Sequence, residues 1–466
     1  MADVVGAVID QGASDWQVFQ QNDKGVADIA LSGRWGGPKM TAVEIRLVRE
    51  DTGMPPARHL DWQRARAGRN GAWSGMLRNV PAGGLYRIET HLLANKNDPQ
   101  EWGVRGDMRH FIGVGDLWII AGQSNSVGYG RGPSYDQPEL GVHVFNNAMR
   151  WALASQPLND STDTAHAENR EGGNGGHSPW LHWARLVKQE VGFPIGLIQT
   201  SLGGSPLSSW NPTEEGSHPL YELMVRAVKA AGGRARGVLW YQGCSDACSS
   251  SAARSYERRF AAAVRAWRKA LKSPRLAVMT VQINRFTTLA GDEGDLNWTI
   301  LREAQRRLPH RLSGVTVVPT LDLPLSDGVH NSPQANSLLA HRVAQAALAS
   351  AYGRDVDYLA PEPASARAAD GGRVIELALA NIRSHIATID PGAIPFRVED
   401  AEGVVPVQKV EYPARTHSNV LRLHLGRKLS GRAVVHAGYG ANPPIMPADG
   451  VSMAPMLGFY GFPVTG

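Results

Sequence analysis

The chain has 466 residues, of which 42% are hydrophobic and 20% are charged, a balance typical of soluble globular proteins with a large core. This length exceeds that of one ordinary domain, so two or three domains are expected. The net charge of +5 and the isoelectric point of about 9.2 are mild for this length, and no dense lysine and arginine block occurs, which argues against nucleic-acid binding.

The sequence also bears on membranes and on the cell compartment. No apolar stretch reaches the roughly 18 residues that are needed to cross a membrane. The N-terminal segment lacks a basic region followed by an apolar run, so no signal peptide is visible. From the sequence as given we expect a cytoplasmic protein, or a periplasmic or secreted one if a signal peptide has been removed.

Residues 1–113 alternate apolar and polar side chains in short segments, which glycine, proline and asparagine separate. This pattern is typical of β-strands, and no helical period of useful length interrupts it. We therefore expect an N-terminal β domain over residues 1–113, with an immunoglobulin-like sandwich as the natural arrangement.

From residue 114 to 358 short apolar segments alternate with amphipathic helical ones. One helix is expected from Pro219 to Gly232, and the last begins at Ser332 and ends near Gly353. Buried strands that alternate with helices indicate a parallel sheet covered on both faces, and such sheets bind ligands at the carboxyl ends of their strands. The expected strands are 117–121, 142–145, 194–199, 237–241, 276–283 and 315–319.

Residues 159–179 are polar, rich in glycine and aperiodic, which predicts a long loop. Loops of this length are usually functional or disordered, and a role as a lid is one hypothesis. After the segment 360–372 strand patterns return, so a second β domain is expected over residues 361–466.

Two short segments about two hundred residues apart contain the residue types of acyl-transfer catalysis. AGQSN places Ser124 just past an expected strand, and DGVH places Asp327 three residues before His330. A serine hydroxyl is a poor nucleophile until a base takes its proton, histidine titrates near neutrality, and a carboxylate fixes the tautomer of histidine. The three residues form a candidate triad, although each segment alone is more often a helix cap or a turn.

Four segments in order resemble the signature blocks of the SGNH hydrolases: GQSN at 122–125, TSLGGSPLSSW at 200–210, WYQGCSDA at 240–247 and DGVH at 327–330. They are most similar to the branch that contains sialate O-acetylesterases and plant and bacterial carbohydrate acetylesterases. The resemblance spans about 114 to 352, and the flanking β domains also resemble that branch. It implies a three-layer α/β/α domain with a parallel sheet, flanked by β-sandwich-like domains, and serine-based deacetylation of sugars.

The resemblance also assigns roles to single residues. It implies Ser124 as the nucleophile, His330 as the general base and Asp327 as the acid that orients it. It implies oxyanion donors in the backbone N–H groups of Ser124 and Gly204, where the absence of a Cβ lets the backbone approach the intermediate. The third donor in SGNH enzymes is usually a side-chain amide, and Gln242 is the only amide in its block, so we expect this role for Gln242.

The chain departs from the related acetylesterases at Cys244, where they commonly have glutamate. A thiol cannot replace the interactions of a carboxylate. Cys244 and Cys248, the only two cysteines, are four residues apart and could meet on a helical turn. Two free thiols are favoured, while a disulfide and a soft-metal site stay open; so few cysteines argue against a disulfide framework or a cysteine-rich zinc site.

Aromatic side chains beside the blocks are candidates for a platform on which a sugar ring stacks, and core packing is an equally good expectation for each. These candidates are Trp210, Trp240 and Tyr129, with Arg131 at the edge of the site. The sequence has no H-E-x-x-H motif, no P-loop and no G-x-G-x-x-G motif, and G-x-S-x-G fails because residue 126 is serine. We therefore expect neither a metal nor another cofactor.

The sequence thus predicts a carbohydrate O-acetylesterase that releases acetate from acetylated plant-type oligosaccharides or polysaccharides through an acetyl-enzyme. A sialate O-acetylesterase is the alternative among enzymes. A glycan-binding protein without catalytic activity is the alternative from another class. Neither nucleic acid nor a membrane is an expected partner, and the oligomeric state, the particular glycan and the acetylated position stay open.

Overall fold

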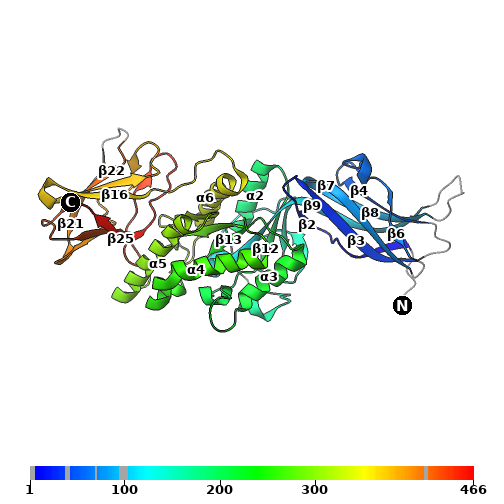
Figure 1. The fold of residues 1–466 in the computed structure, drawn as a ribbon, viewed down its shortest axis with the longest axis horizontal. Coiled ribbons are helices and arrows are strands. Elements are labelled where there is room, and N and C mark those ends of the chain that lie inside the picture. The colour runs from blue at the N-terminus through cyan, green and yellow to red at the C-terminus, as the bar shows by residue number, and fades with distance from the viewer. Residues whose placement is uncertain (1–5, 37–41, 69–70, 94–102, 174, 414–417) are drawn as a thin grey trace.

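The computed structural model describes residues 6–36, 42–68, 71–93, 103–173, 175–413 and 418–466. The molecule is elongated, with sheet structure at both ends and the long helices between them (Figure 1). Three large hydrophobic cores follow one another along the chain. We propose that they correspond to the three expected domains.

The N-terminal core lies between two sheets. One has the strand order β1-β3-β7-β6, and in the other β4 pairs with β5 and β8, and β8 with β9. The core side chains alternate along these strands, and burying each large aliphatic one contributes about 1.5–3 kcal/mol. The elements are β1 (Gly6–Gln11), β2 (Val18–Gln20), β3 (Val26–Gly36), β4 (Ala42–Arg49), η1 (Arg58–Leu60), β5 (Gln63–Arg64), β6 (Arg66–Ala67), β7 (Ala72–Pro81) and β8 (Gly83–Leu93).

Strand β9 (Gly103–Gly122) belongs to both the N-terminal and the central sheet. Its first part pairs antiparallel with β8 up to Val114, and its last part, from Asp116, pairs parallel with β12 and β13. The expected limit between residues 113 and 114 therefore falls inside one continuous strand. The N-terminal and central sheets therefore share one strand and are not separated by a loop.

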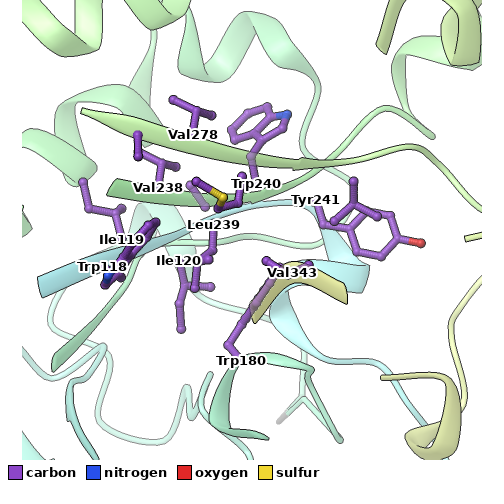
Figure 2. Close-up of a cluster of buried hydrophobic side chains, with 14 of the residues drawn as sticks. Trp118, Ile119, Ile120, Trp180, Val238, Leu239, Trp240, Tyr241, Val278 and Val343 are labelled. Carbon is purple, nitrogen blue, oxygen red and sulfur yellow. The ribbon is translucent and has the colours of Figure 1, made fainter. Parts of the chain in front are cut away.

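The central sheet has the order β11-β10-β12-β9-β13-β14-β15 and is parallel except for β11. Helices α2 and α6 pack on one face, and α3, α4 and α5 lie on the other. Figure 2 shows Trp180 of α2 and Val343 of α6 together beneath the strands. The strands are β10 (Val142–Phe145), β11 (Trp151–Leu153), β12 (Ile195–Gln199), β13 (Gly237–Tyr241), β14 (Ala277–Val281) and β15 (Val315–Val318).

Helices α3 and α6 begin and end at the residues that the sequence predicts, because capping and helix-breaking residues lie there. Helix α3 starts with Pro219 and is followed by Gly232, and α6 is capped by the Ser332 hydroxyl, which accepts from the Ala335 N–H. The helical elements are α1 (Ser124–Val127), η2 (Ala167–Asn169), α2 (Trp180–Val191), η3 (Leu207–Trp210), α3 (Pro219–Ala231), η4 (Asp246–Cys248), α4 (Ser250–Ala270), α5 (Gly291–Arg311) and α6 (Pro333–Tyr352).

The C-terminal core lies between a sheet of order β16-β17-β22-β21 and a sheet of order β20-β19-β23-β25. Strand β16 lies in the segment 360–372, where no strand was predicted. The alanines of β16 have a weak β propensity, but they pair with β17, and this tertiary pairing outweighs the propensity. The elements are β16 (Glu362–Ala369), η5 (Asp370–Gly372), β17 (Val374–Ala380), β18 (Ile386–Ala387), β19 (Phe396–Asp400), β20 (Gly403–Val405), β21 (Val407–Glu411), β22 (Val420–Leu425), β23 (Ala433–Ala437), β24 (Ala448–Asp449) and β25 (Phe459–Val464).

The segments with candidate functional residues follow the carboxyl ends of parallel strands. Ser124 follows β9, Gly204 follows β12, and Gln242 follows β13. The DGVH segment, 327–330, lies between β15 and α6. The fold therefore brings the four blocks to one edge of the central sheet, as the parallel arrangement predicts.

Candidate active site

Ser124, His330 and Asp327 form one hydrogen-bonded chain. His330 Nε2 lies 2.9 Å from Ser124 Oγ, and His330 Nδ1 lies 2.7 Å from Asp327 Oδ2. Ser124 is partly exposed and the His330 side chain is mostly covered, so the serine hydroxyl faces both solvent and the imidazole. This arrangement can pass a proton from serine to histidine while the carboxylate holds the other ring nitrogen.

The DGVH loop holds its own aspartate in place. Asp327 Oδ1 accepts the backbone N–H groups of Val329 and His330, each at 2.8 Å, which leaves Oδ2 for the imidazole. Partial burial raises the pKa of Asp327, but the bonds from the His330 ring and from the two N–H groups outweigh it, so the pKa lies below its ordinary value. The carboxylate therefore stays ionised throughout the neutral range.

Asn125 joins the nucleophile turn to the histidine loop, a role that the sequence analysis did not recognise. Its Oδ1 accepts the Asn331 N–H at 2.9 Å, and its Nδ2 donates to the Val329 carbonyl at 3.1 Å. These two residues flank His330 in the sequence. Asn125 thus fixes the loop on both sides of the imidazole.

The two expected backbone donors of the oxyanion hole are unengaged. In the part of the chain that the structure describes, neither the Ser124 N–H nor the Gly204 N–H has an acceptor. Gly204 has φ of +66°, in the left-handed region, where an L side chain costs about 1–2 kcal/mol. A Cβ there would meet no protein atom within 4 Å, so within the protein itself the backbone conformation favours glycine, and closer approach to the intermediate stays a prediction.

The geometry contradicts the oxyanion role predicted for Gln242. Its Nε2 donates to Asp246 Oδ2 at 2.6 Å and to the Ser205 carbonyl at 3.2 Å, and its Oε1 accepts the Tyr256 hydroxyl at 2.9 Å. The side chain is fully buried. Directly after β13 the chain turns this amide toward α4, so it supports the Gly204 loop through Ser205 instead of facing the nucleophile.

Gln123, next to the nucleophile, has the amide environment that was expected of Gln242. Its Oε1 accepts the N–H groups of Gly243 and Ser245 at 3.0 and 3.2 Å, which fixes the orientation of the amide. Its Nε2 donates to no described residue. The position of Gln123 directly before Ser124 was the only sequence signal that could have indicated it.

Two of the four candidates for sugar binding lie in the core. Trp210 and Trp240 are fully buried and contact each other edge to face with ring centroids 5.4 Å apart. Their indole N–H groups donate to Ser205 Oγ and to the Tyr256 hydroxyl. Of the two equal expectations for these residues, core packing is the one that holds, and a stacking platform is wrong, because the Trp210 ring packs inward from η3 and the Trp240 ring from β13 (Figure 2 shows Trp240).

Tyr129 and Arg131 do lie at the site. The Tyr129 ring stacks on the His330 ring with centroids 4.9 Å apart and planes 30° apart, so one of its faces is covered. Burial and the Glu171 carboxylate, which accepts its hydroxyl, raise the pKa of Tyr129 to about 12. Arg131 is exposed, and its guanidinium lies 5.7 Å from the Tyr129 ring centroid. Sugar binding by these two residues stays a prediction.

Comparison with known proteins identifies the family. The family model described as carbohydrate esterase, sialic acid-specific acetylesterase, matches residues 114–349. The chain belongs to this family. A probable carbohydrate esterase of Arabidopsis thaliana is 31% identical over 256 residues, which cover 50% of this chain and 90% of that protein.

The fold as a whole recurs in a solved structure. The crystal structure of a carbohydrate acetylesterase from Xanthomonas citri matches with a TM-score of 0.69 and 22% identity, and covers 97% of this chain and 99% of that one. The expected SGNH-type fold is confirmed, and the chain is a carboxylic ester hydrolase of the carbohydrate acetylesterase kind.

The cysteines of this esterase are two free thiols, the alternative that the sequence favoured. Burial raises the pKa of the Cys244 thiol to about 12, so it stays protonated at neutral pH. Among the described residues no group of three or more histidine, cysteine, aspartate or glutamate side chains could hold a metal ion. The described helices include none that is long and apolar enough to span a membrane.

Proposed function

We propose that the chain is a serine-dependent carbohydrate O-acetylesterase that works through an acetyl-enzyme on Ser124. The observation that carries this proposal is the unbroken path from Ser124 Oγ through the His330 ring to Asp327, with contacts of 2.9 and 2.7 Å. The neighbouring N–H groups of Ser124 and Gly204, which have no acceptor among the described residues, support it further.

The first half of the reaction transfers the acetyl group. His330 Nε2 accepts the Ser124 proton as Oγ attacks the acetyl carbonyl, and Asp327 steadies the imidazolium through Nδ1–H. The carbonyl oxygen becomes an oxyanion, to which the N–H groups of Ser124 and Gly204 donate. When the intermediate collapses, the sugar oxygen leaves and takes the proton from His330.

The second half releases acetate. A water molecule gives a proton to His330 and attacks the acetyl-enzyme, and the same two N–H groups stabilise the second oxyanion. When this intermediate collapses, the bond between Ser124 Oγ and the acyl carbon breaks, Oγ takes the proton back from His330, and acetate leaves. We further propose that Gln123 Nε2 is the third donor. The bonds that hold its Oε1 on Gly243 and Ser245 leave both amide hydrogens available beside Ser124.

The openness of the site favours an extended substrate, such as an acetylated plant-type oligosaccharide or polysaccharide. The Asp327 side chain is 45% exposed, although it belongs to the triad. Tyr135, four residues after Arg131, is 86% exposed. Leu289 is fully exposed, and Thr287, two residues before it, donates its N–H to the Gly328 carbonyl of the DGVH loop. A polymer can lie across such a surface, whereas a small ester is usually enclosed.

Acetate release across acetylated xylan, xyloglucan, pectin and sialic acids tests the substrate class. The proposal expects release from at least one plant polysaccharide, and none from the Ser124→Ala variant. Release from acetylated sialic acid alone would instead identify a sialate O-acetylesterase. Binding to a glycan with no release of acetate from any substrate would contradict the proposal.

The triad itself is tested by a double-mutant comparison. Ser124→Ala and His330→Ala should each lower kcat by at least about a thousandfold, and the double variant should be hardly worse, because both residues act in one proton transfer. The measurement is hydrolysis of p-nitrophenyl acetate. Losses that multiply in the double variant would show that the two residues act separately.

A further inference from the structure

Glu171, in the loop 159–179, joins two parts of the active site. Its Oε1 accepts the Gly203 N–H at 2.5 Å, and its Oε2 accepts the Tyr129 hydroxyl at 2.7 Å. Gly203 directly precedes Gly204, the proposed oxyanion donor. Tyr129 stacks on His330, the proposed base. The Glu171 carboxylate therefore bonds to Gly203 and Tyr129, which are the neighbours of the Gly204 N–H and of the His330 ring. Both of these groups must keep their positions during the reaction.

The space at Gly203 is shaped for this contact. A Cβ at Gly203 would lie 2.9 Å from Glu171 Oε2 and 3.3 Å from the Tyr129 hydroxyl oxygen. The carboxylate and the phenol thus occupy the place that a side chain would take. The two adjacent positions favour glycine for different reasons: Glu171 and Tyr129 lie too close for a side chain at Gly203, and the backbone of Gly204 is left-handed.

The loop that carries Glu171 is fastened to the catalytic domain. Asn159 Nδ2 donates to the Ser201 carbonyl at 3.1 Å, and buried Asn147 bonds to both Asn159 and Asn169. Farther along, the Gly176 N–H donates to the Gly128 carbonyl at 2.5 Å. These bonds fit a fixed wall of the site better than the hinged lid that was one hypothesis for this loop.

The charge of Glu171 points to a geometric role. A carboxylate one residue away from an oxyanion donor repels the negative charge that develops in the transition state. Its two hydrogen bonds therefore cannot help by electrostatic stabilisation of that charge. They can help by holding Gly204 and the His330 ring in register, since a displacement of about 1 Å can reduce a rate about a hundredfold.

We propose that Glu171 is a positioning residue for deacetylation, which sets the Gly204 loop through Gly203 and the His330 ring through Tyr129. This inference rests on the proposed function of Ser124 and His330. It assigns to the long loop a task in the chemical step rather than in the capture of substrate.

Three variants separate geometry from charge. Glu171→Ala removes both bonds and should lower kcat about 10- to 100-fold with KM changed less than about threefold. Glu171→Gln can still accept from Gly203 with Oε1 and can donate to the Tyr129 oxygen with Nε2, so it should keep at least about half of kcat. Tyr129→Phe keeps the stacked ring, and its combination with Glu171→Ala should be hardly slower than Glu171→Ala alone.

Glu168 provides the matched control. It lies in the same loop and is partly buried like Glu171, but it pairs with Arg226 at 3.2 Å, away from the triad. Glu168→Ala should leave kcat and KM for p-nitrophenyl acetate unchanged. Circular dichroism of every variant checks that it is folded; if Glu171→Ala does not fold, Glu171→Gln and Tyr129→Phe decide the question.

The outcomes distinguish this inference from the proposed function. Ser124→Ala is measured in parallel: if it stays active, the proposed function itself fails. If Ser124→Ala is inactive but Glu171→Ala matches the Glu168→Ala control, only the positioning role is overturned. A higher KM with unchanged kcat would also overturn it, because that result would assign Glu171 to substrate binding. A Glu171→Gln variant as slow as Glu171→Ala would overturn it too, because the charge of Glu171 would then be the property that matters.

Discussion

The two glutamines nearest the nucleophile occupy opposite environments. Gln123 uses only its amide oxygen, on Gly243 and Ser245, whereas buried Gln242 uses both ends of its amide, on Asp246, Ser205 and Tyr256. A donor to a developing oxyanion needs a hydrogen without another partner. Of the two glutamines, only Gln123 meets this condition within the described residues.

Substitution of the two glutamines should therefore affect different properties, namely activity for Gln123 and stability for Gln242. Gln123→Ala should lower kcat about a hundredfold, the typical loss for one oxyanion donor, with little change of KM or of melting temperature. Gln242→Ala leaves buried partners unpaired, so it should lower the free energy of unfolding by about 1–3 kcal/mol and kcat much less. Kinetics with p-nitrophenyl acetate and thermal melts measure both; a reversed pattern would restore Gln242 as the donor.

Two short sequence segments and the resemblance of four blocks predicted the triad, but not the side chains that surround it. Ser124, Asp327 and His330 could be placed because the DGVH spacing and the strand before Ser124 fix their geometry locally. The positions of Trp210 and Gln242 depend on which way a side chain turns after its strand ends, and the packing of η3 and α4 decides that. Glu171 lies in an aperiodic loop, so no local pattern points to its contacts.

At the level of elements, α5 holds the C-terminal region against the central domain. Its Arg302 is fully buried and donates to five backbone carbonyls, those of Ile283, Asn284, Gly438, Gly440 and Ala441. Asp295 and Thr299 of the same helix accept the N–H groups of Ala441 and Gly440. The helix is thus amphipathic in an unusual way, with polar side chains on its buried face, and its apolar pattern is correspondingly weak.

Arg302→Met should be strongly destabilising, because it leaves buried carbonyls without donors. We expect the free energy of unfolding in urea to fall by at least about 3 kcal/mol. Arg307 on the same helix is half-exposed and pairs with Glu257, so the control Arg307→Met should cost no more than about 1 kcal/mol. Equal stability of the two variants would contradict this account of the interface.

Parallel strands could be predicted because both faces are buried, which gives continuous apolar runs such as 237–241. The same reasoning could not find that β9 continues through residue 113. The sequence pattern changes there because one strand passes from one sheet to the next, and such a change looks like a domain boundary. It also missed β16, whose alanines carry little strand preference and pair only because β17 lies beside them.

At the level of the whole molecule, two buried histidines connect stability to pH. His143 on β10 packs edge-on against Trp16, and His436 lies on β23 in the C-terminal core region. Burial lowers the pKa of each to about 4. In the folded protein both are therefore neutral at pH 5, whereas in the unfolded chain each takes up a proton below about pH 6.5.

Stability should consequently fall on acidification from pH 6.5 to pH 4. Between these values the unfolded chain binds more protons than the folded one, so the free energy of unfolding rises with pH. A His143→Gln, His436→Gln double variant should have a flatter profile over this window, as measured by urea unfolding. A wild-type profile that is already flat from pH 7 to pH 4.5 would contradict the buried, neutral state of both histidines.

In the proposed mechanism Ser124 becomes covalently acylated, so labelling with a serine-directed phosphonate is the decisive measurement. We expect complete loss of esterase activity, an adduct that mass spectrometry locates on Ser124, no adduct in Ser124→Ala, and full activity in the presence of EDTA. An adduct on Ser205 or Ser245, or activity that survives complete labelling, would contradict it.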